Sequence, residues 1–439
     1  MIIRKKNIGL SSSLFLLLLF NFENFALSKT LEDENLDLLE KVITLVDKEY
    51  IDLTNQNELM ESAINGILQS LDPHSVYLPP KEFENLQNNT SGQFGGLGIE
   101  VTMENGIIKV ISPIDDSPAL KAGMVEGDYI THINSEPILG KSLSDAVDLM
   151  RGEPKTEITI TVVREKNDSA FDLKIIRDII QIPGVRMQIE GHNKSIGYIR
   201  ISTFNEKTSE KLFKELYVIE NSNEKNIKGY ILDLRRNPGG LLKQAIEVTN
   251  MFLEEGEIVS TKRPRFKEKI RSFNAKPGDI TNGKPLIIIV NGGSASASEI
   301  VAGALQDNNR AIIIGTRTFG KGSVQTLYPL NKNNIFFPNS KNLGAIKLTT
   351  AEYYTPSGRS IQAEGIIPDF IIEQKSDENN DPEKYKVGET QLNKFIKNNG
   401  KEGSESGSSA YIPENEEKDT QLNLAIKILE NLLLQIQIS

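Results

Sequence analysis

The sequence predicts an α/β multidomain protein with a largely parallel sheet at its core, a smaller β-rich module before it and helical segments at both ends. Three observations lead to this class. After residue 195, short apolar strands alternate with helices, which is typical of βαβ units. Residues 92–177 carry short alternating strands around one helix, and residues 31–70 and 422–438 have helical apolar spacing.

The elements follow in a clear order along the chain. The helical stretch ends at Asp72-Pro73, where a proline turn stops the periodicity. The β-rich module is expected to hold strands at 98–103, 107–111, 129–133 and 157–163 and a helix at 142–150. The core is expected to hold strands at 196–201, 229–234, 286–290, 311–314, 345–353 and 366–372 and helices at 208–217, 241–252 and 298–305.

Residues 374–420 are rich in charged and small polar residues, which predicts a flexible linker. The predicted domains are a leader over 1–28, an N-terminal helical segment over 29–90, the β-rich domain over 91–177, the core over 178–373, the linker over 374–420 and a C-terminal helix over 421–439.

Composition excludes several classes of function. The 439 residues carry a net charge of −10 without a long basic run, which argues against a nucleic-acid partner. The absence of cysteine excludes thiol catalysis, disulfides and zinc–thiolate sites. With three histidines (His74, His132 and His192), we expect neither a metal site nor a cofactor.

The first residues have the pattern of a secretory signal peptide. Arg4 opens a basic stretch, residues 8–20 are largely apolar, and Ala26-Leu27-Ser28 places small residues before a cleavage point at Lys29. The apolar run is short for a spanning helix of about 20 residues, although an uncleaved anchor is the alternative. We therefore expect an exported, periplasmic protein, attached to the inner membrane if the leader is retained.

The segment 286–300 contains a candidate nucleophile. A buried strand runs into Asn-Gly-Gly-Ser-Ala-Ser-Ala-Ser, and a helix follows. Such a turn exposes a side chain at the end of a strand, and the helix N-terminus favours developing negative charge. Phosphate loops and simple helix caps share this pattern, so the turn by itself leaves those alternatives open.

A lysine follows the next predicted strand. Lys321 stands between Gly320 and Gly322, so the two turns are expected to meet at one edge of the sheet. A buried lysine can act as a base because burial disfavours the ammonium form. Moving its pKa from about 10.4 to near 7 requires roughly 5 kcal/mol. A solvated turn lysine is the alternative.

These residues resemble the C-terminal processing peptidases, or tail-specific proteases. The resemblance covers roughly residues 35–372 and keeps the order of the motifs. They are Asp-Leu-Arg-Arg-Asn-Pro-Gly-Gly at 233–240, Gly-Ser-Ala-Ser-Ala-Ser-Glu at 293–299, Thr-Phe-Gly-Lys-Gly-Ser-Val-Gln at 318–325, Tyr-Tyr-Thr-Pro-Ser-Gly-Arg-Ser-Ile-Gln at 353–362 and the stretch 365–369.

The resemblance implies a serine endopeptidase with a crotonase-like core and a Ser/Lys dyad. It assigns Ser296 as nucleophile, with Ser294 and Ser298 as alternatives, and Lys321 as general base. It places Gln325 beside the lysine and the oxyanion-hole donors at Ala297 and Gly239, the latter in preference to Gly240.

A second resemblance identifies the β-rich domain. Phe94-Gly95-Gly96-Leu97-Gly98-Ile99-Glu100-Val101 resembles the carboxylate-binding loop of a PDZ domain, and the downstream Ala122-Gly123 and Gly127-Asp128 strengthen the match. The implied peptide-binding residues are Gly96, Leu97, Gly98, Ile99, Val147 and Met150. Val147 fits a core role equally well. Arg151 is a candidate for coupling tail binding to the active site.

The expected partners are therefore protein substrates with unstructured apolar C-terminal tails. The apolar terminal helices suggest a homo-oligomer or docking element, and an adaptor protein is a further candidate partner. Two other functions remain as alternatives, a proteolytically inactive PDZ-bearing binding protein or chaperone and an acyl-CoA enzyme of crotonase type. The three histidines do not follow core strands, so we expect structural or surface roles for them.

Overall fold

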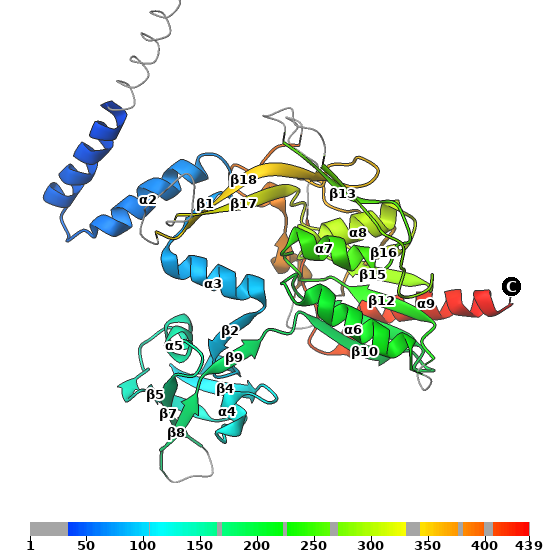
Figure 1. The fold of residues 1–439 in the computed structure, drawn as a ribbon, viewed down its shortest axis with the longest axis horizontal. Helices are drawn as coiled ribbons and strands as arrows, with labels where there is room; N and C mark the ends of the chain where they lie inside the picture. Colours follow the sequence, from blue (N-terminus) through cyan, green and yellow to red (C-terminus); the bar gives the residue numbers. More distant parts are fainter. Residues whose placement is uncertain are drawn as a thin grey trace, which may run out of the picture. The chain divides into compact units, whose positions relative to one another are not determined.

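The computed structural model describes residues 34–104, 106–164, 169–222, 226–263, 271–330, 343–375, 381–398 and 407–438. It confirms the α/β multidomain class (Figure 1). The chain divides into two units, residues 1–71 and residues 72–439. The leader expected over 1–28 lies outside the described residues.

The first unit is helical where it is described. Residues 34–49 form one helix, and α2 (Gln56–Gln69) forms another. Asn55 begins α2 as its N-cap, accepting a hydrogen bond from the Asn57 N–H. Within this unit large apolar side chains are exposed, among them Leu36, Leu45 and Ile51.

The central sheet of the second unit has six strands. Their order is β10 (Val185–Glu190), β11 (Ile196–Ile201), β12 (Gly229–Asp233), β15 (Leu286–Val290), β16 (Ile312–Gly315) and β19 (Phe370–Ile371). β11 through β19 pair in parallel, and β10 is antiparallel to β11. The expected strand over 366–372 is limited to the two residues of β19.

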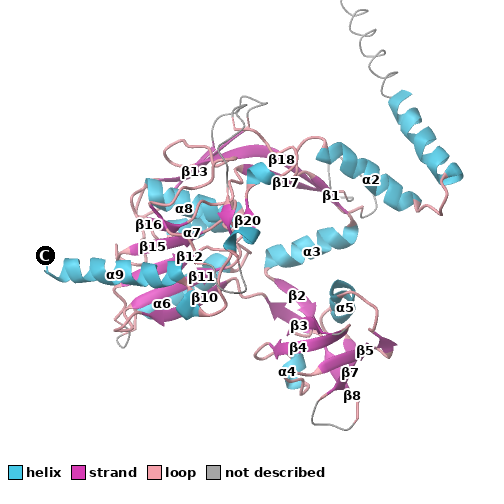
Figure 2. Cartoon of the chain, turned by 180° about the vertical axis from the view of Figure 1, so that it is seen from behind, coloured by secondary structure: helices cyan, strands magenta, loops and turns pink. Residues whose placement is uncertain are grey.

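Helices cover both faces of this sheet (Figure 2). Alternate residues of β15 point to opposite faces, so Ile288 joins the core beneath one set of helices and Ile289 joins the core beneath the other. The first face carries α6 (Thr208–Glu220), α7 (Leu242–Asn250) and α8 (Ala297–Asp307), and the second carries α9 (Thr420–Ile438). This two-sided burial explains the uninterrupted apolar run Leu-Ile-Ile-Ile-Val.

A second sheet lies around β18 (Ala345–Tyr354). β18 pairs with β1 (Val76–Leu78), β13 (Glu257–Lys262) and β17 (Ser323–Pro329), and β13 pairs with β14 (Arg271–Asn274). The structure thus differs from the N-terminal segment expected over 29–90. Tyr77 is buried and pairs with Ile346, so the chain enters the sheet of the core by residue 76.

The β-rich module has its own sheet and its own apolar core. A helix, α3 (Pro80–Ser91), precedes it, and the pair β2 (Gln93–Gly96) and β9 (Asp178–Gln181) forms its entrance and exit. The sheet contains β3 (Ile99–Glu104), β4 (Ile107–Pro113), β5 (Tyr129–Ile133), β6 (Glu136–Pro137), β7 (Glu157–Val163) and β8 (Phe171–Ile176), with helices α4 (Pro118–Lys121) and α5 (Leu143–Met150).

The C-terminal segment differs from the flexible linker expected over 374–420. Its described parts form η2 (Pro382–Tyr385), β20 (Lys386–Val387), η3 (Glu389–Gln391), β21 (Ser408–Ser409) and η4 (Glu416–Lys418). β20 pairs with β21, and the Gly292 N–H donates to the Ser409 carbonyl. The polar residues of this stretch satisfy backbone groups of the core. None of the described helices has the length and apolarity needed to span a membrane.

Candidate active site

Three loops meet where adjacent parallel strands end. β12, β15 and β16 are neighbours in the sheet, and they lead into residues 234–241, 291–296 and 316–322 respectively. The Ala295 N–H donates to the Asn237 carbonyl at 3.0 Å, and the Phe319 N–H donates to the Ser294 carbonyl at 3.0 Å. The structure therefore brings the serine turn and the lysine turn to one edge of the sheet, as the sequence predicts.

The three serines of the turn differ in their exposure to solvent. Ser294 Oγ donates to the Leu234 carbonyl at 2.8 Å, and Ser298 Oγ donates to the Asn237 carbonyl at 2.9 Å. Both residues are fully buried, so these hydroxyls belong to the scaffold. Ser296 is partly exposed and has a φ of 53°, a left-handed conformation that is costly for a residue with a side chain. Only the middle serine of the three is thus accessible to a substrate.

A buried carboxylate joins the two turns. Glu299, on the first turn of α8, accepts hydrogen bonds at Oε2 from the N–H groups of Ser296 (2.8 Å) and Lys321 (2.9 Å). Its Oε1 accepts from the Gly320 N–H (2.7 Å) and the Thr318 hydroxyl (2.6 Å). Because one oxygen binds both N–H groups, the backbones of Ser296 and Lys321 are held close together. Sequence reasoning missed Glu299, although Ser-x-x-Glu before a helix is the spacing of a capping box.

Burial shifts both titratable groups toward their neutral forms. Burial raises the pKa of Glu299 to about 7, partly offset by the hydrogen bonds from Thr318, Gly320, Ser296 and Lys321. Burial also lowers the pKa of the Lys321 ammonium, and the nearby charge of Lys347 lowers it further. The carboxylates of Glu389, Glu299 and Asp72 oppose this shift only in part. Lys321 is therefore closer to a neutral amine than a solvated lysine is.

Gln325 is the third residue of β17 and follows Lys321 by four positions. Its Nε2 donates to Ser323 Oγ at 3.0 Å and to Thr349 Oγ1 at 3.3 Å. Among the described residues, no hydrogen bond joins Gln325 to Lys321. Thr349 Oγ1 donates in turn to Asp72, at 3.1 Å from Oδ1. Gln325 thus connects to the surroundings of Lys321 through Thr349 and Asp72, and its direct contact with the lysine stays a prediction.

The expected oxyanion donors lie next to Ser296. A Cβ added to Gly239 would come within 2.9 Å of Ser296 Cβ and 3.0 Å of the Ala297 nitrogen, so only glycine fits there. Within the described structure no acceptor is recorded for the Ala297 N–H at the start of α8, or for the Gly240 N–H. The Gly239 N–H donates to Asn237 Oδ1 at 2.9 Å, so it must leave that oxygen before it can bind an oxyanion.

Comparison with known proteins decides the family. Residues 195–372 match Peptidase family S41, residues 95–175 match the PDZ domain, and residues 21–81 match the activating protease CtpB N-terminal domain. The chain is 50% identical over 399 residues to the carboxy-terminal-processing protease of Bartonella bacilliformis, covering 90% of this chain and 87% of that one. The chain belongs to the carboxy-terminal-processing proteases.

The chain is also similar to other processing proteases. The protease is 34% identical over 371 residues to the carboxy-terminal processing protease CtpB of Bacillus subtilis, covering 83% of this chain and 72% of that one. Among solved structures, the photosystem II D1 C-terminal processing protease is 27% identical and has a TM-score of 0.42, covering 76% of this chain and 92% of that one. The expected serine-type peptidase with a PDZ domain is confirmed.

The PDZ domain of the protease presents the loop that the sequence predicts. Gly98 has a φ of 73°, and a Cβ there would come within 2.5 Å of Ser117 Cβ. No acceptor is recorded in the described structure for the N–H groups of Leu97 and Gly98. Leu97 and Met150 are buried in the domain core, whereas Ile99 and Val147 are partly buried and pack against it.

Arg151 lies at the end of α5 and connects the PDZ domain to α3. Its Nη1 donates to Asn85 Oδ1 at 3.3 Å, and its guanidinium lies 4.9 Å from the centre of the Phe94 ring. A neighbouring arginine, Arg177, donates to the Met150 and Leu149 carbonyls and so caps the C-terminus of α5. The coupling role expected of Arg151 stays a prediction, but its contacts place it between the two elements.

A buried ionic cluster is centred on Arg235, in the loop 234–241 that carries Gly239. Arg235 is 1% exposed, and its two terminal nitrogens donate to the Asp419 carboxylate at 2.8 and 2.7 Å. Its Nη2 also donates to Asp233 at 2.7 Å. Burial by itself would lower the pKa of Arg235, but the charges of Asp233 and Asp419 reverse this and raise it. The cluster fastens the start of α9 to the loop that carries Gly239.

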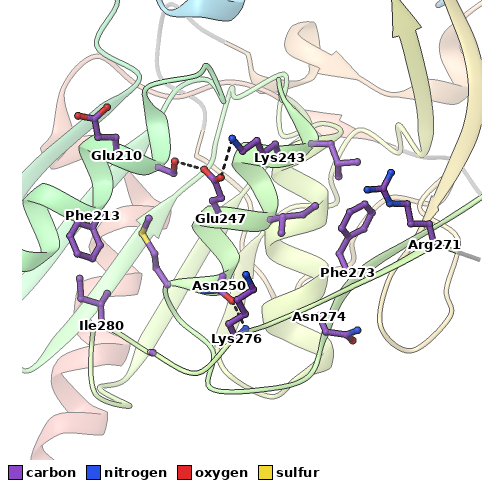
Figure 3. A pocket seen from close by; sticks show the side chains of 15 residues that line it. Glu210, Phe213, Lys243, Glu247, Asn250, Arg271, Phe273, Asn274, Lys276 and Ile280 are labelled. Atoms are coloured by element: carbon purple, nitrogen blue, oxygen red, sulfur yellow. Dashed lines mark hydrogen bonds and ion pairs between the residues drawn. The ribbon is translucent and has the colours of Figure 1, made fainter.

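A cavity of about 870 Å³ lies away from this chemistry, between α6, α7 and β14 (Figure 3). Apolar side chains such as Phe213, Ile246 and Phe273 line it. Its carboxylate Glu247 is engaged by the Ser209 hydroxyl at 2.6 Å. Neither Ser296 nor Lys321 lines the cavity, so we assign it no part in the reaction.

Proposed function

We propose that this protease cleaves protein substrates near their C-terminal tails with a Ser296/Lys321 dyad, and that its PDZ domain recognises the tail. The observation that carries the proposal is the shared carboxylate of Glu299. It binds the backbone N–H groups of Ser296 and Lys321, while Ser294 and Ser298 are buried in the scaffold.

The proposed reaction uses these groups in turn. Neutral Lys321 takes the proton from Ser296 Oγ, and the oxygen attacks the scissile carbonyl. The Ala297 N–H, with a glycine N–H of the 239–240 loop, stabilises the oxyanion that forms. The Lys321 ammonium then gives its proton to the leaving amine, which departs and leaves an acyl-enzyme. Lys321 next takes a proton from the water that attacks the ester, and gives it to Ser296 Oγ as the acid product leaves.

Tail recognition rests on the PDZ loop. The N–H groups of Leu97 and Gly98 can bind a terminal carboxylate, and the tail can extend β3 as an added strand. Ile99 and Val147 are the predicted pocket residues that remain partly accessible, so they are the better candidates for contacting the last side chain. Leu97 and Met150 support that pocket from the core.

We further propose export to the periplasm, which rests on the leader pattern of residues 1–28. For self-association, the two terminal segments differ. Leu422, Ala425 and Leu429 of α9 are buried against the protease's own sheet. The proposed homo-oligomer therefore rests on the exposed apolar side chains of the N-terminal unit, such as Leu45 and Ile51.

The test is cleavage of a folded protein that carries an unstructured, apolar C-terminal tail. Wild type should release a product, whereas Ser296→Ala and Lys321→Ala should each be inactive with an unchanged circular dichroism spectrum. The double variant should be little worse than either single one, because the two groups act as a unit. Activity in Ser296→Ala would show that another serine carries the reaction. A folded wild type that binds the tail without cutting it would favour a binding protein.

A further inference from the structure

A second buried carboxylate contacts the lysine turn from outside the region that matches Peptidase family S41. Glu389 lies in η3 of the C-terminal segment and is fully buried. Its N–H donates to the Phe319 carbonyl at 2.9 Å, two residues before Lys321. Its backbone is thus bonded to the start of the turn.

The side chain of Glu389 reaches the other end of the turn through a glutamine. Gln362 Nε2 donates to Glu389 Oε1 at 2.9 Å, and Gln362 Oε1 accepts from the Gly322 N–H at 3.0 Å. The backbones of Gly322 and Gln362 approach closely here, because a Cβ on Gly322 would come within 2.4 Å of the backbone nitrogen of Gln362. Glu389 therefore holds the turn 319–322 at both ends, while Glu299 holds its middle.

His74 completes the arrangement from a third part of the chain. Its Nε2 lies 2.9 Å from both carboxylate oxygens of Glu389, and its side chain is 12% exposed. The His74 N–H donates to Asp72 Oδ1, which is also bonded to Thr349. The bond between His74 and Glu389 thus joins residues 315 positions apart in the chain, beside the turn that carries Lys321.

We propose that Glu389 is a positioning residue for the catalytic lysine, which it keeps in reactive geometry by bracing the turn 319–322, with His74 as its partner. This inference rests on the proposed Ser296/Lys321 chemistry. It assigns the C-terminal segment a part in catalysis rather than a role as a linker, because the segment supplies a carboxylate residue that bonds to both ends of the turn, directly at Phe319 and through Gln362 at Gly322.

The charges around Lys321 give the proposal a readout beyond simple loss of activity. The groups that act on Lys321 are Lys347 on β18, Glu299 on α8, Asp72 before β1 and Glu389, with His74 against Glu389. The negative charge of Glu389 favours the ammonium form of Lys321. Removing that charge should let Lys321 lose its proton at lower pH, so the acid limb of the rate profile should move to lower pH.

Two substitutions separate bracing from charge. Glu389→Gln keeps an oxygen that can accept from Gln362 but removes the charge, whereas Glu389→Ala removes both. We expect Glu389→Ala to lower kcat by about 10- to 100-fold with little change in KM, because misplacing a catalytic group by about 1 Å has an effect of that size. Glu389→Gln should recover most of kcat and show the shifted acid limb. Glu383→Gln, at an exposed position of η2, is the matched control and should behave as wild type.

The experiment measures kcat and KM across pH for these variants, with the rate of Ser296 labelling by a fluorophosphonate and with Lys321→Ala in parallel. The positioning role is overturned if a folded Glu389→Ala has the kcat of wild type, or if the acid limb of Glu389→Gln lies at the same pH as that of wild type. Either result counts against it even when Lys321→Ala is inactive. An active Lys321→Ala overturns the Ser/Lys chemistry and the positioning role with it. Should Glu389→Ala fail to fold, the pH profile of Glu389→Gln decides alone.

Discussion

Replacement of Glu299 by glutamine or alanine tests how the two turns are held together. Four donors point at the carboxylate, the N–H groups of Ser296, Lys321 and Gly320 and the hydroxyl of Thr318. A glutamine presents one oxygen and one NH₂. If the oxygen faces Ser296 and Lys321, the Thr318 oxygen can accept from the NH₂, but the Thr318 O–H and the Gly320 N–H both lose their acceptor.

The magnitudes follow from this count. One buried donor without an acceptor costs about 1–3 kcal/mol, so Glu299→Gln, which strands two, should lose about 2–6 kcal/mol at acid pH, and Glu299→Ala, which strands all four, about twice as much. Burial raises the pKa of Glu299 from its ordinary 4.5 to about 7. This favours the protonated folded state by roughly 3 kcal/mol, a contribution that is complete below about pH 4.5 and is lost as pH rises through about 7.

Glutamine does not titrate, so the stability of Glu299→Gln relative to wild type should improve by roughly 3 kcal/mol between pH 5 and pH 8.5. Urea unfolding followed by circular dichroism measures this difference. Peptide cleavage at pH 8.5 measures function, where Glu299→Gln should keep most of the activity and Glu299→Ala should lose about 100-fold or more. A folded Glu299→Ala with wild-type cleavage, or a stability difference that does not change with pH, would refute the reasoning.

Four other outcomes are expected. Asp419→Ala should destabilise the fold by about 3 kcal/mol in urea, because it leaves Arg235 buried with one carboxylate fewer, whereas the exposed Glu210→Gln should change little. The cleavage rate should rise with pH as Lys321 loses its proton, and replacing His132 and His192 should leave this rise unchanged. A substrate with an amidated tail should bind about 10- to 150-fold more weakly than one with a free tail, and Gly98→Trp should abolish this preference but leave fluorophosphonate labelling of Ser296 unchanged. Deleting residues 29–71 should change the mass seen by light scattering, whereas an unchanged mass would argue against self-association through that unit.

The sequence alone determined the central sheet and the two turns of the candidate site. Apolar runs such as Leu286–Val290 are buried on both faces, and two-sided burial leaves a pattern in the chain that can be read locally. The small residues around Ser296 and the glycines around Lys321 are equally local signals. They predicted that two turns at neighbouring strand ends would meet, and the parallel pairing of β15 with β16 brings them there.

The tertiary structure decided the contacts that make these turns a site. Whether Ser294, Ser296 or Ser298 is accessible depends on the carbonyls of residues 234 and 237, which lie on another loop. The stretch 374–420 has the composition of a linker, yet its polar groups bind the backbone of the serine and lysine turns. Hydrophobic burial repeats along an element and so marks the sequence, whereas a hydrogen bond such as that between His74 and Glu389 joins single residues far apart in the chain. Such a bond has no period to read, and it exists only once the fold has brought its two ends together.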